Sequence, residues 1–441
     1  MITYNVVTTK TGLRVIQVPI SGIKSVTVLA LVNTGSRYEQ PKWWGIAHFL
    51  EHMVFKGTEK YPDTQVLAST VDAVGAKWNA FTSKEYTGYY VKAASSQASL
   101  AIDVISELLL TPQIRQEDID REKGVIVEEM NMYADMPAAH IANLYEQMIF
   151  DEKTLGHDII GVRDTVNNLT ATDFNEFIHQ WYGLKNVVLI LSGDPEVVGN
   201  AKTMTEIEKA FAKGNPGKRQ AAVALEHLGD HPMTDKRFLL EYRKTEQAHF
   251  VLGFPSLSRK HPDRYAASLL SVVIGGSMSS RLFSEVREKR GLCYYIHSDL
   301  DFFHDTGMFG ASAGVDPQRV EEALKVTIDQ FASVVDGRQP ITQADLKKAK
   351  DFMAGKFILD LEDSENVAQY YGMKQLLIGE IESPDEVLAK YQAVTLEDMN
   401  RVAKDIIQMD QIRFAIIGPF EDPQKFQQLL PSTSTTKAEE K

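Results

Sequence analysis

The six residues LTATDF at positions 169–174 have a counterpart in VTLEDM at positions 394–399. Each stretch predicts the start of a helix that leads into a strand, and the two strands end at Gly193 and Gly418. Both offsets are 225 positions (394−169 and 418−193). A register shared by two elements favours an internal duplication over a chance likeness between two α/β segments.

The elements expected around these stretches follow one order in both halves. In the first half we expect strands at residues 12–18, 25–32, 77–82, 85–92 and 186–191, and helices at 44–55, 64–74 and 116–132 and from about 97, 137 and 172. In the second half we expect strands at residues 238–242, 249–254, 295–302, 307–313 and 412–417. Asp118-Ile119 likewise resembles Asp345-Leu346. The sequence therefore predicts two similar mixed α/β halves.

Residues 213–237 separate the halves, because this segment is weakly patterned and carries glycine, proline and charge. We expect a first domain at residues 1–215 and a linker at 216–236. A second, homologous domain is expected at residues 237–430. The tail at residues 431–441 is rich in Ser, Thr, Lys and Glu, which predicts disorder.

The overall charge narrows the possible partners. The 441 residues include 60 acidic and 47 basic side chains, a formal charge of −13, whereas nucleic-acid binding requires a basic face. No apolar run approaches the roughly 18–20 residues that span a bilayer, and the N-terminus lacks the regions of a signal peptide. The single cysteine, Cys293, excludes an intrachain disulfide. We expect a cytoplasmic protein that binds neither nucleic acid nor membrane.

The stretch His48-Phe49-Leu50-Glu51-His52 predicts a metal site. On a helix, residues four apart share a face, so His48 and His52 can converge on one ion with Glu51 beside them. A catalytic zinc ion is held by three protein ligands and keeps one position for water. Glu51 is then the candidate base that takes a proton from this water and passes it to the leaving amine. The spacing is that of the inverted zincins, and it leaves the third ligand open.

A later stretch supplies a candidate for that ligand. Residues 125–129 read VIVEE, and together with the HxxEH motif they resemble the pitrilysin, insulysin and mitochondrial processing peptidase family. The resemblance implies that Glu129 is the third zinc ligand. Glu128 is the alternative, and only one of the two can face the metal, because adjacent helical residues point about 100° apart. Glu122, seven residues earlier, matches a family carboxylate that would orient a histidine.

Two further segments resemble the substrate-binding parts of this family. Residues 75–82, GAKWNAFT, resemble its edge strand, and the resemblance implies that Asn79, Ala80 and Phe81 bind the substrate. In the second half, Arg287 and Tyr294 match an Arg–Tyr pair that binds the substrate backbone and supports the oxyanion. Tyr295 is the alternative to Tyr294. Cys293 stands where the family usually has Ala, and a small buried thiol accounts for it.

The resemblance covers residues 12 to about 420 and implies a two-domain, bacterial-type member of the family. The fold class is α+β (mixed α/β), with two homologous domains, each a mostly antiparallel sheet with helices packed on it. Relative to an offset of 227 (345−118), Glu129 corresponds to Lys356 and Glu122 to Ala349, so the second domain cannot repeat the metal site.

The implied function is that of a zinc endopeptidase with one Zn²⁺ per chain. It would hydrolyse short or unfolded peptides inside a closed chamber, and a homodimer is expected because one chain carries both the zinc motif and the Arg–Tyr pair. Two alternatives stay open: a non-catalytic scaffold, and one subunit of a hetero-oligomeric processing peptidase.

Overall fold

The computed structural model describes residues 3–219 and 233–431, and these residues form two compact units. Neither unit is continuous along the chain. Unit 1 consists of the described residues within 1–132, 152–232 and 357–385. Unit 2 consists of those within 133–151, 233–356 and 386–441. The chain therefore passes between the units several times.

Unit 1 contains a six-stranded sheet in the order β1-β2-β6-β3-β5-β4. Its strands are β1 (Asn5–Thr8), β2 (Arg14–Pro19), β3 (Ser25–Val32), β4 (Lys77–Thr82), β5 (Thr87–Ala94) and β6 (Val187–Gly193). All pairs are antiparallel except β2 with β6. The central strands β3 and β6 are almost fully buried, so both faces of the sheet are covered.

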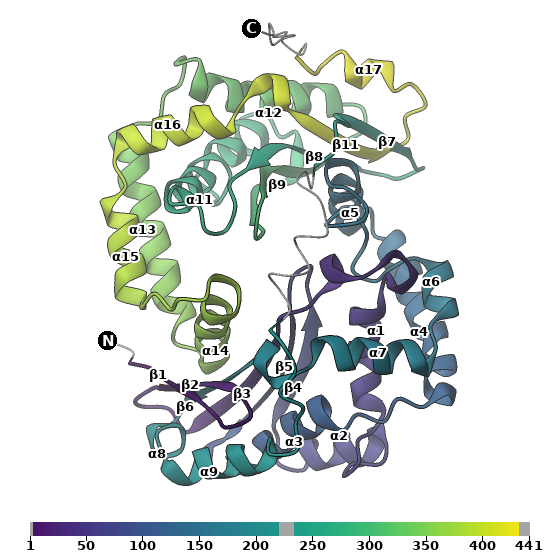
Figure 1. The fold of residues 1–441 in the computed structure, drawn as a ribbon. Helices are drawn as coiled ribbons and strands as arrows, with labels where there is room; N and C mark the ends of the chain where they lie inside the picture. The colour runs from purple at the N-terminus through teal and green to yellow at the C-terminus, as the bar shows by residue number, and fades with distance from the viewer. Residues whose placement is uncertain (1–2, 220–232, 432–441) are drawn as a thin grey trace, which may run out of the picture. The chain divides into compact units, whose positions relative to one another are not determined.

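Helices cover the two faces of this sheet in different ways. One face packs on helices of the first half: α1 (Ile46–Met53), α2 (Thr64–Asp72), α3 (Ala98–Leu110), α4 (Gln116–Ala134), α6 (Arg163–Asn168), α7 (Ala171–Trp181), α8 (Pro195–Val198) and α9 (Ala201–Ala210). The other face packs on α14 (Ser364–Met373) from the second half. In Figure 1, α14 is the green helix beside the purple strands.

Unit 2 contains a five-stranded sheet in the order β7-β11-β8-β10-β9. Its strands are β7 (Phe238–Tyr242), β8 (Ala248–Ser256), β9 (Cys293–Phe302), β10 (Gly307–Val315) and β11 (Arg413–Gly418). Its helices are α11 (Arg264–Ile274), α12 (Val320–Val335), α13 (Gln343–Asp360, whose last residues belong to unit 1), α15 (Pro384–Ala393, whose first residues belong to unit 1), α16 (Leu396–Ile406) and α17 (Gln424–Gln427). The helix α5 (Pro137–Ile149) of the first half also packs on this sheet.

The two sheets have the same topology, which confirms the predicted fold class. The order β2-β6-β3-β5-β4 corresponds strand by strand to β7-β11-β8-β10-β9, and each contains one parallel pair, β2 with β6 and β7 with β11. The helices α7 and α16, which begin in the repeated stretches, both start with a capping box, at Thr170 and Thr395. A Thr side chain and an Asp three residues later satisfy the free amide groups of the first turn.

The structure adds features that the sequence did not predict. The strand β1 was missed because it is short and mostly exposed, so it lacks a clear hydrophobic pattern. Each half also contributes a helix to the other unit, α5 to unit 2 and α14 to unit 1, whereas the predicted domains 1–215 and 237–430 were continuous. Most of the predicted linker and nearly all of the predicted disordered tail at residues 431–441 lie outside the described residues. Within the described ranges, no helix is both long and apolar enough to cross a membrane.

Candidate metal centre

The helix α1 carries the HxxEH motif with its polar side chains on one face. Its buried residues are Ile46, Ala47, Phe49, Leu50 and Met53. His48, Glu51 and His52 occupy the remaining face and are half-buried. The period of 3.6 residues therefore separates the face that packs on the sheet from the face that holds the motif.

A buried carboxylate fixes the start of this helix. Glu39 accepts hydrogen bonds from the backbone amides of Gly45 and Ala47, at 2.7 and 2.8 Å. Free amide groups and the positive end of the helix dipole favour a negative charge at this position. Gly45 has a φ of +96°, and a Cβ atom there would lie 2.5 Å from the carbonyl oxygen of Ile160. Only glycine fits this approach without a shift of the backbone.

We expect Gly45→Ala to lower the stability of the protein by about 1–3 kcal/mol, because it adds backbone strain and a steric clash at the start of α1. Gly124→Ala is the matched control. Gly124 lies within α4 with nothing near its missing Cβ, so alanine should raise stability by about 0.5–1 kcal/mol. Denaturant unfolding of the metal-free proteins measures both changes. Equal midpoints for the two variants would contradict this account of Gly45.

The third predicted ligand approaches from α4. Glu129 Oε1 lies 3.7 Å from His48 Nε2, and Glu129 Oε2 lies 3.4 Å from His52 Nε2. Ligand atoms of the three side chains lie within 4.8 Å of one another. Across the part of the chain that the structure describes, no other group of His, Cys, Asp and Glu side chains meets this criterion. Glu128, the alternative to Glu129, is exposed on another side of α4.

Carboxylates and imidazoles of this cluster shift each other's pKa toward the charged forms. The neighbouring imidazoles of His48 and His52 stabilise the carboxylate of Glu129 and lower its pKa to about 2. Burial disfavours the protonated imidazole of His52, but the hydrogen-bonded Glu122 carboxylate and the nearby Glu129 carboxylate outweigh it and raise the pKa of His52 to about 9. Without a metal, His52 is therefore protonated at neutral pH, and a cation that binds there replaces a proton.

The cluster fits a zinc ion by the chemistry of its donors. Zinc binds imidazole nitrogen and carboxylate oxygen, and two His with one Glu leave a fourth position open, as in catalytic sites. The Nε2 atoms of His48 and His52 both face Glu129. The Nδ1 atom of His48 is buried and has no hydrogen-bond partner among the described residues.

Glu122 contacts the His52 ring at Nδ1, the nitrogen that does not face Glu129. Its Oε1 atom lies 3.0 Å from His52 Nδ1, and its Oε2 atom lies 2.5 Å from Lys56 Nζ. The Glu122 side chain is 8% exposed. A carboxylate at this distance favours a proton on Nδ1 and leaves the lone pair of Nε2 for a metal.

We expect Glu122→Gln to weaken zinc binding about 10–100-fold, because the neutral amide no longer holds the Nδ1 proton of His52 as strongly. Titration of the metal-free protein against a zinc chelator measures the dissociation constant. Glu117→Gln, at an exposed position of the same helix, is the control and should leave the constant unchanged. Unchanged affinity in Glu122→Gln would remove the assigned role of Glu122.

Glu51 is held by the strand β4. The hydroxyl of Thr82, the last residue of β4, donates a hydrogen bond to Glu51 Oε2 at 2.6 Å. This bond leaves Oε1 of the Glu51 carboxylate available. Thr82 was part of the predicted edge-strand segment, but its contact with Glu51 was not predicted.

Among the described strands, β4 is an edge strand, since it pairs with β5 alone. Side chains alternate along a strand, so Asn79 and Phe81 point away from the face on which Ala80 and α1 pack. Asn79 is exposed. The Phe81 ring lies over Gly88 and packs against the cluster that contains α14. Along its outer edge, β4 therefore offers backbone N–H and C=O groups. Binding of the substrate by the side chains of Asn79, Ala80 and Phe81 stays a prediction.

Arg287 and Tyr294 lie in unit 2, close to each other. The guanidinium carbon of Arg287 is 5.9 Å from the centre of the Tyr294 ring, and Tyr294 is 76% exposed. The alternative, Tyr295, is hydrogen-bonded to His249 Nδ1 at 3.0 Å, and burial raises its pKa to about 12. Cys293 is half-buried, and burial raises the pKa of its thiol to about 11, which disfavours the reactive thiolate.

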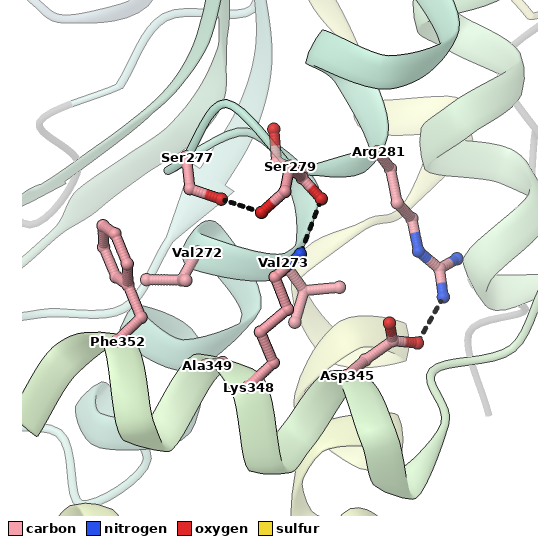
Figure 2. Close-up of a pocket in the computed structure, with 10 residues that line it drawn as sticks. Val272, Val273, Ser277, Ser279, Arg281, Asp345, Lys348, Ala349 and Phe352 are labelled. Atoms are coloured by element: carbon pink, nitrogen blue, oxygen red, sulfur yellow. Dashed lines mark hydrogen bonds and ion pairs between the residues drawn. The ribbon is translucent and has the colours of Figure 1, made fainter.

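The second half has no metal site at the corresponding positions. A pocket of about 40 Å³ lies at this place in the second half. Lys348 Nζ donates to the Ser279 carbonyl at 2.8 Å, a contact that is drawn in Figure 2. Asp345, the counterpart of Asp118, pairs there with Arg281 at 3.1 Å. Ala349, the counterpart of Glu122, is buried in its wall. These side chains belong to the packing of unit 2.

Comparison with known proteins finds relatives of this chain over most of its length. Residues 14–163 match the family described as Insulinase (Peptidase family M16), and residues 168–353 match the Peptidase M16 inactive domain. A protein of Streptomyces coelicolor named as an uncharacterized zinc protease is 36% identical over 415 residues, which cover 94% of this chain and 89% of the relative. The uncharacterized zinc protease YmxG of Bacillus subtilis is 33% identical over 412 residues, 93% of this chain and 97% of the relative.

Solved structures share the fold. The crystal structure of a protease from Helicobacter pylori superposes with a TM-score of 0.84 at 24% identity and covers 95% of this chain and all of the other. That of a peptidase M16 inactive domain from Pseudomonas fluorescens superposes with a TM-score of 0.83 at 19% identity and covers 95% of this chain and 98% of the other.

Proposed function

Because this chain belongs to the insulinase (M16) peptidase family, we propose that it is a zinc-dependent endopeptidase that hydrolyses short or unfolded peptides. One zinc ion per chain would be held by His48, His52 and Glu129. The observation that carries the proposal is the convergence of these three side chains beside Glu51, which is not itself needed as a ligand.

The proposed roles follow from the groups present. A bound zinc ion supplies a Lewis acid that makes water a nucleophile near neutral pH and polarises a carbonyl group. Glu51 takes a proton from the attacking water and passes it to the leaving amine. The hydroxyl of Thr82 orients the Glu51 carboxylate for this transfer through their 2.6 Å hydrogen bond. Glu122 holds the tautomer of His52.

Substrate binding is proposed to use the open edge of β4. An extended peptide that pairs with this edge forms main-chain hydrogen bonds without requiring a particular sequence. Arg287 and Tyr294 together offer a cation and a phenol donor, which can stabilise negative charge on the carbonyl oxygen during the reaction. The exposure of Tyr294 supports this assignment over Tyr295.

A homodimer that encloses a chamber, in the cytoplasm, remains part of the proposal. It rests on the presence of both the zinc cluster and the Arg–Tyr pair in one chain. The scaffold alternative is disfavoured by the complete donor set, because a scaffold needs no cluster of this kind.

Metal content and unaided activity test the proposal together. The purified chain should bind one zinc ion and cleave a quenched fluorescent peptide, and a chelator should abolish cleavage until zinc is restored. If the purified chain holds no stoichiometric zinc, the result supports the non-catalytic scaffold. A chain that binds zinc but cleaves only after a second, different chain is added is a subunit of a hetero-oligomer.

A further inference from the structure

Lys56 contacts Glu122, and Glu122 contacts His52 of the metal cluster. The ammonium group of Lys56 lies 2.5 Å from Glu122 Oε2, while Glu122 Oε1 lies 3.0 Å from His52 Nδ1. Each oxygen of this carboxylate therefore has one partner. The Nε2 atom on the other side of the His52 ring lies 3.4 Å from Glu129.

Local structure explains why one segment supplies both partners of Glu122. The 3₁₀-helical turn η3 (Val54–Lys56) directly continues α1, so Lys56 lies four residues, about one turn, after His52. The two side chains approach Glu122 of α4 from the same segment. Their positions relative to each other are therefore fixed by the backbone of that segment.

We propose that Lys56 is a positioning residue for the metal site and acts through Glu122 on His52. This inference rests on the proposed zinc site. A carboxylate with a cation on one oxygen cannot turn freely, so its second oxygen stays directed at Nδ1. Charge-assisted hydrogen bonds are stronger than neutral ones, and the limited exposure of both side chains, 26% for Lys56 and 8% for Glu122, reduces screening by solvent.

The simpler alternative is an ordinary ion pair that contributes only to folding. Lys60 offers a matched example, because its ammonium lies 2.7 Å from Asp103 Oδ2, its side chain is 55% exposed, and neither partner touches the metal cluster. An ordinary pair changes the stability of the metal-free protein but does not change its affinity for zinc. A positioning residue changes the affinity and needs Glu122 to do so.

The test measures the zinc dissociation constant of the full-length chain by competition with a chelator. Lys56→Met should weaken binding about tenfold, within the range known for partners behind a metal ligand, and Lys56→Arg should restore most of it. Lys60→Met should leave the constant unchanged. In a Glu122→Gln background, Lys56→Met should cause no further loss, because the contact it acts through is already weakened.

Two results would overturn the inference. One is a constant for Lys56→Met within twofold of the original chain, and the other is an equal loss in the Glu122→Gln background. Denaturant unfolding of the metal-free variants separates a folding defect from a loss of affinity. If the original chain binds no zinc, the proposed function fails as well, whereas normal zinc binding with an unaffected Lys56→Met variant refutes only the role of Lys56.

Discussion

Replacement of Glu51 by glutamine is expected to reduce peptide cleavage about 10²–10⁴-fold while zinc remains bound. Glutamine has nearly the same shape and can still accept the hydrogen bond from Thr82, but its amide cannot take a proton from water. The turnover number measures the loss. Since Glu51 is not among the three clustered side chains, the zinc dissociation constant should not change.

Two observations would contradict the role of Glu51 as the base. Full activity of Glu51→Gln would show that another group takes the proton. Loss of zinc with an unchanged unfolding midpoint would show that Glu51 is a ligand. Thr82→Val is a useful companion, because it removes the 2.6 Å hydrogen bond but keeps the carboxylate, and should cause a smaller loss of rate.

Replacement of Glu129 by glutamine should remove most zinc binding and, with it, activity. The charged carboxylate is one of the three proposed ligands, so its loss should exceed the roughly 10–100-fold effect that is typical for a side chain hydrogen-bonded to a ligand. Chelator competition measures the affinity, and added zinc in excess should restore part of the activity.

Glu128→Gln is the control, because it makes the same chemical change at the adjacent, exposed residue of α4. It should leave affinity and rate unchanged, since a surface substitution of this kind has little effect. If Glu128→Gln lost zinc and Glu129→Gln kept it, the assignment of the ligand would be reversed.

Local patterns were sufficient to predict most elements. The strand at 25–32 was predicted with the bounds that β3 has, because a run of β-branched and aliphatic residues is typical of a buried strand. The helix with His48 and His52 on one face also followed from spacing alone, since i and i+4 share a face. The repeated stretches predicted two similar halves, which the matching sheet orders confirm.

Contacts between distant segments could not be predicted in this way. The assignments of Thr82 to Glu51 and of Lys56 to Glu122 depend on how β4 and α4 pack against α1. A glycine directly before a helix, as at Gly45, is a weak indication of a helix start. No sequence pattern predicts that Glu39 caps this helix. The helix α14 packs on the first sheet through apolar side chains such as Val367 and Tyr371. The sequence shows that these residues are apolar, but not which apolar surface they pack against.

The sequence by itself therefore determined the class of fold, the duplication and the residue types of the proposed metal site. The family resemblance favoured Glu129 over Glu128 and Tyr294 over Tyr295, but only the tertiary structure shows that Glu129 faces the histidines and that Tyr294 is exposed beside Arg287. It also decided which unit each of α5 and α14 joins. The physical reason is that helical and strand periods are set by neighbours a few residues apart, whereas the direction of a side chain toward a distant partner is set by packing.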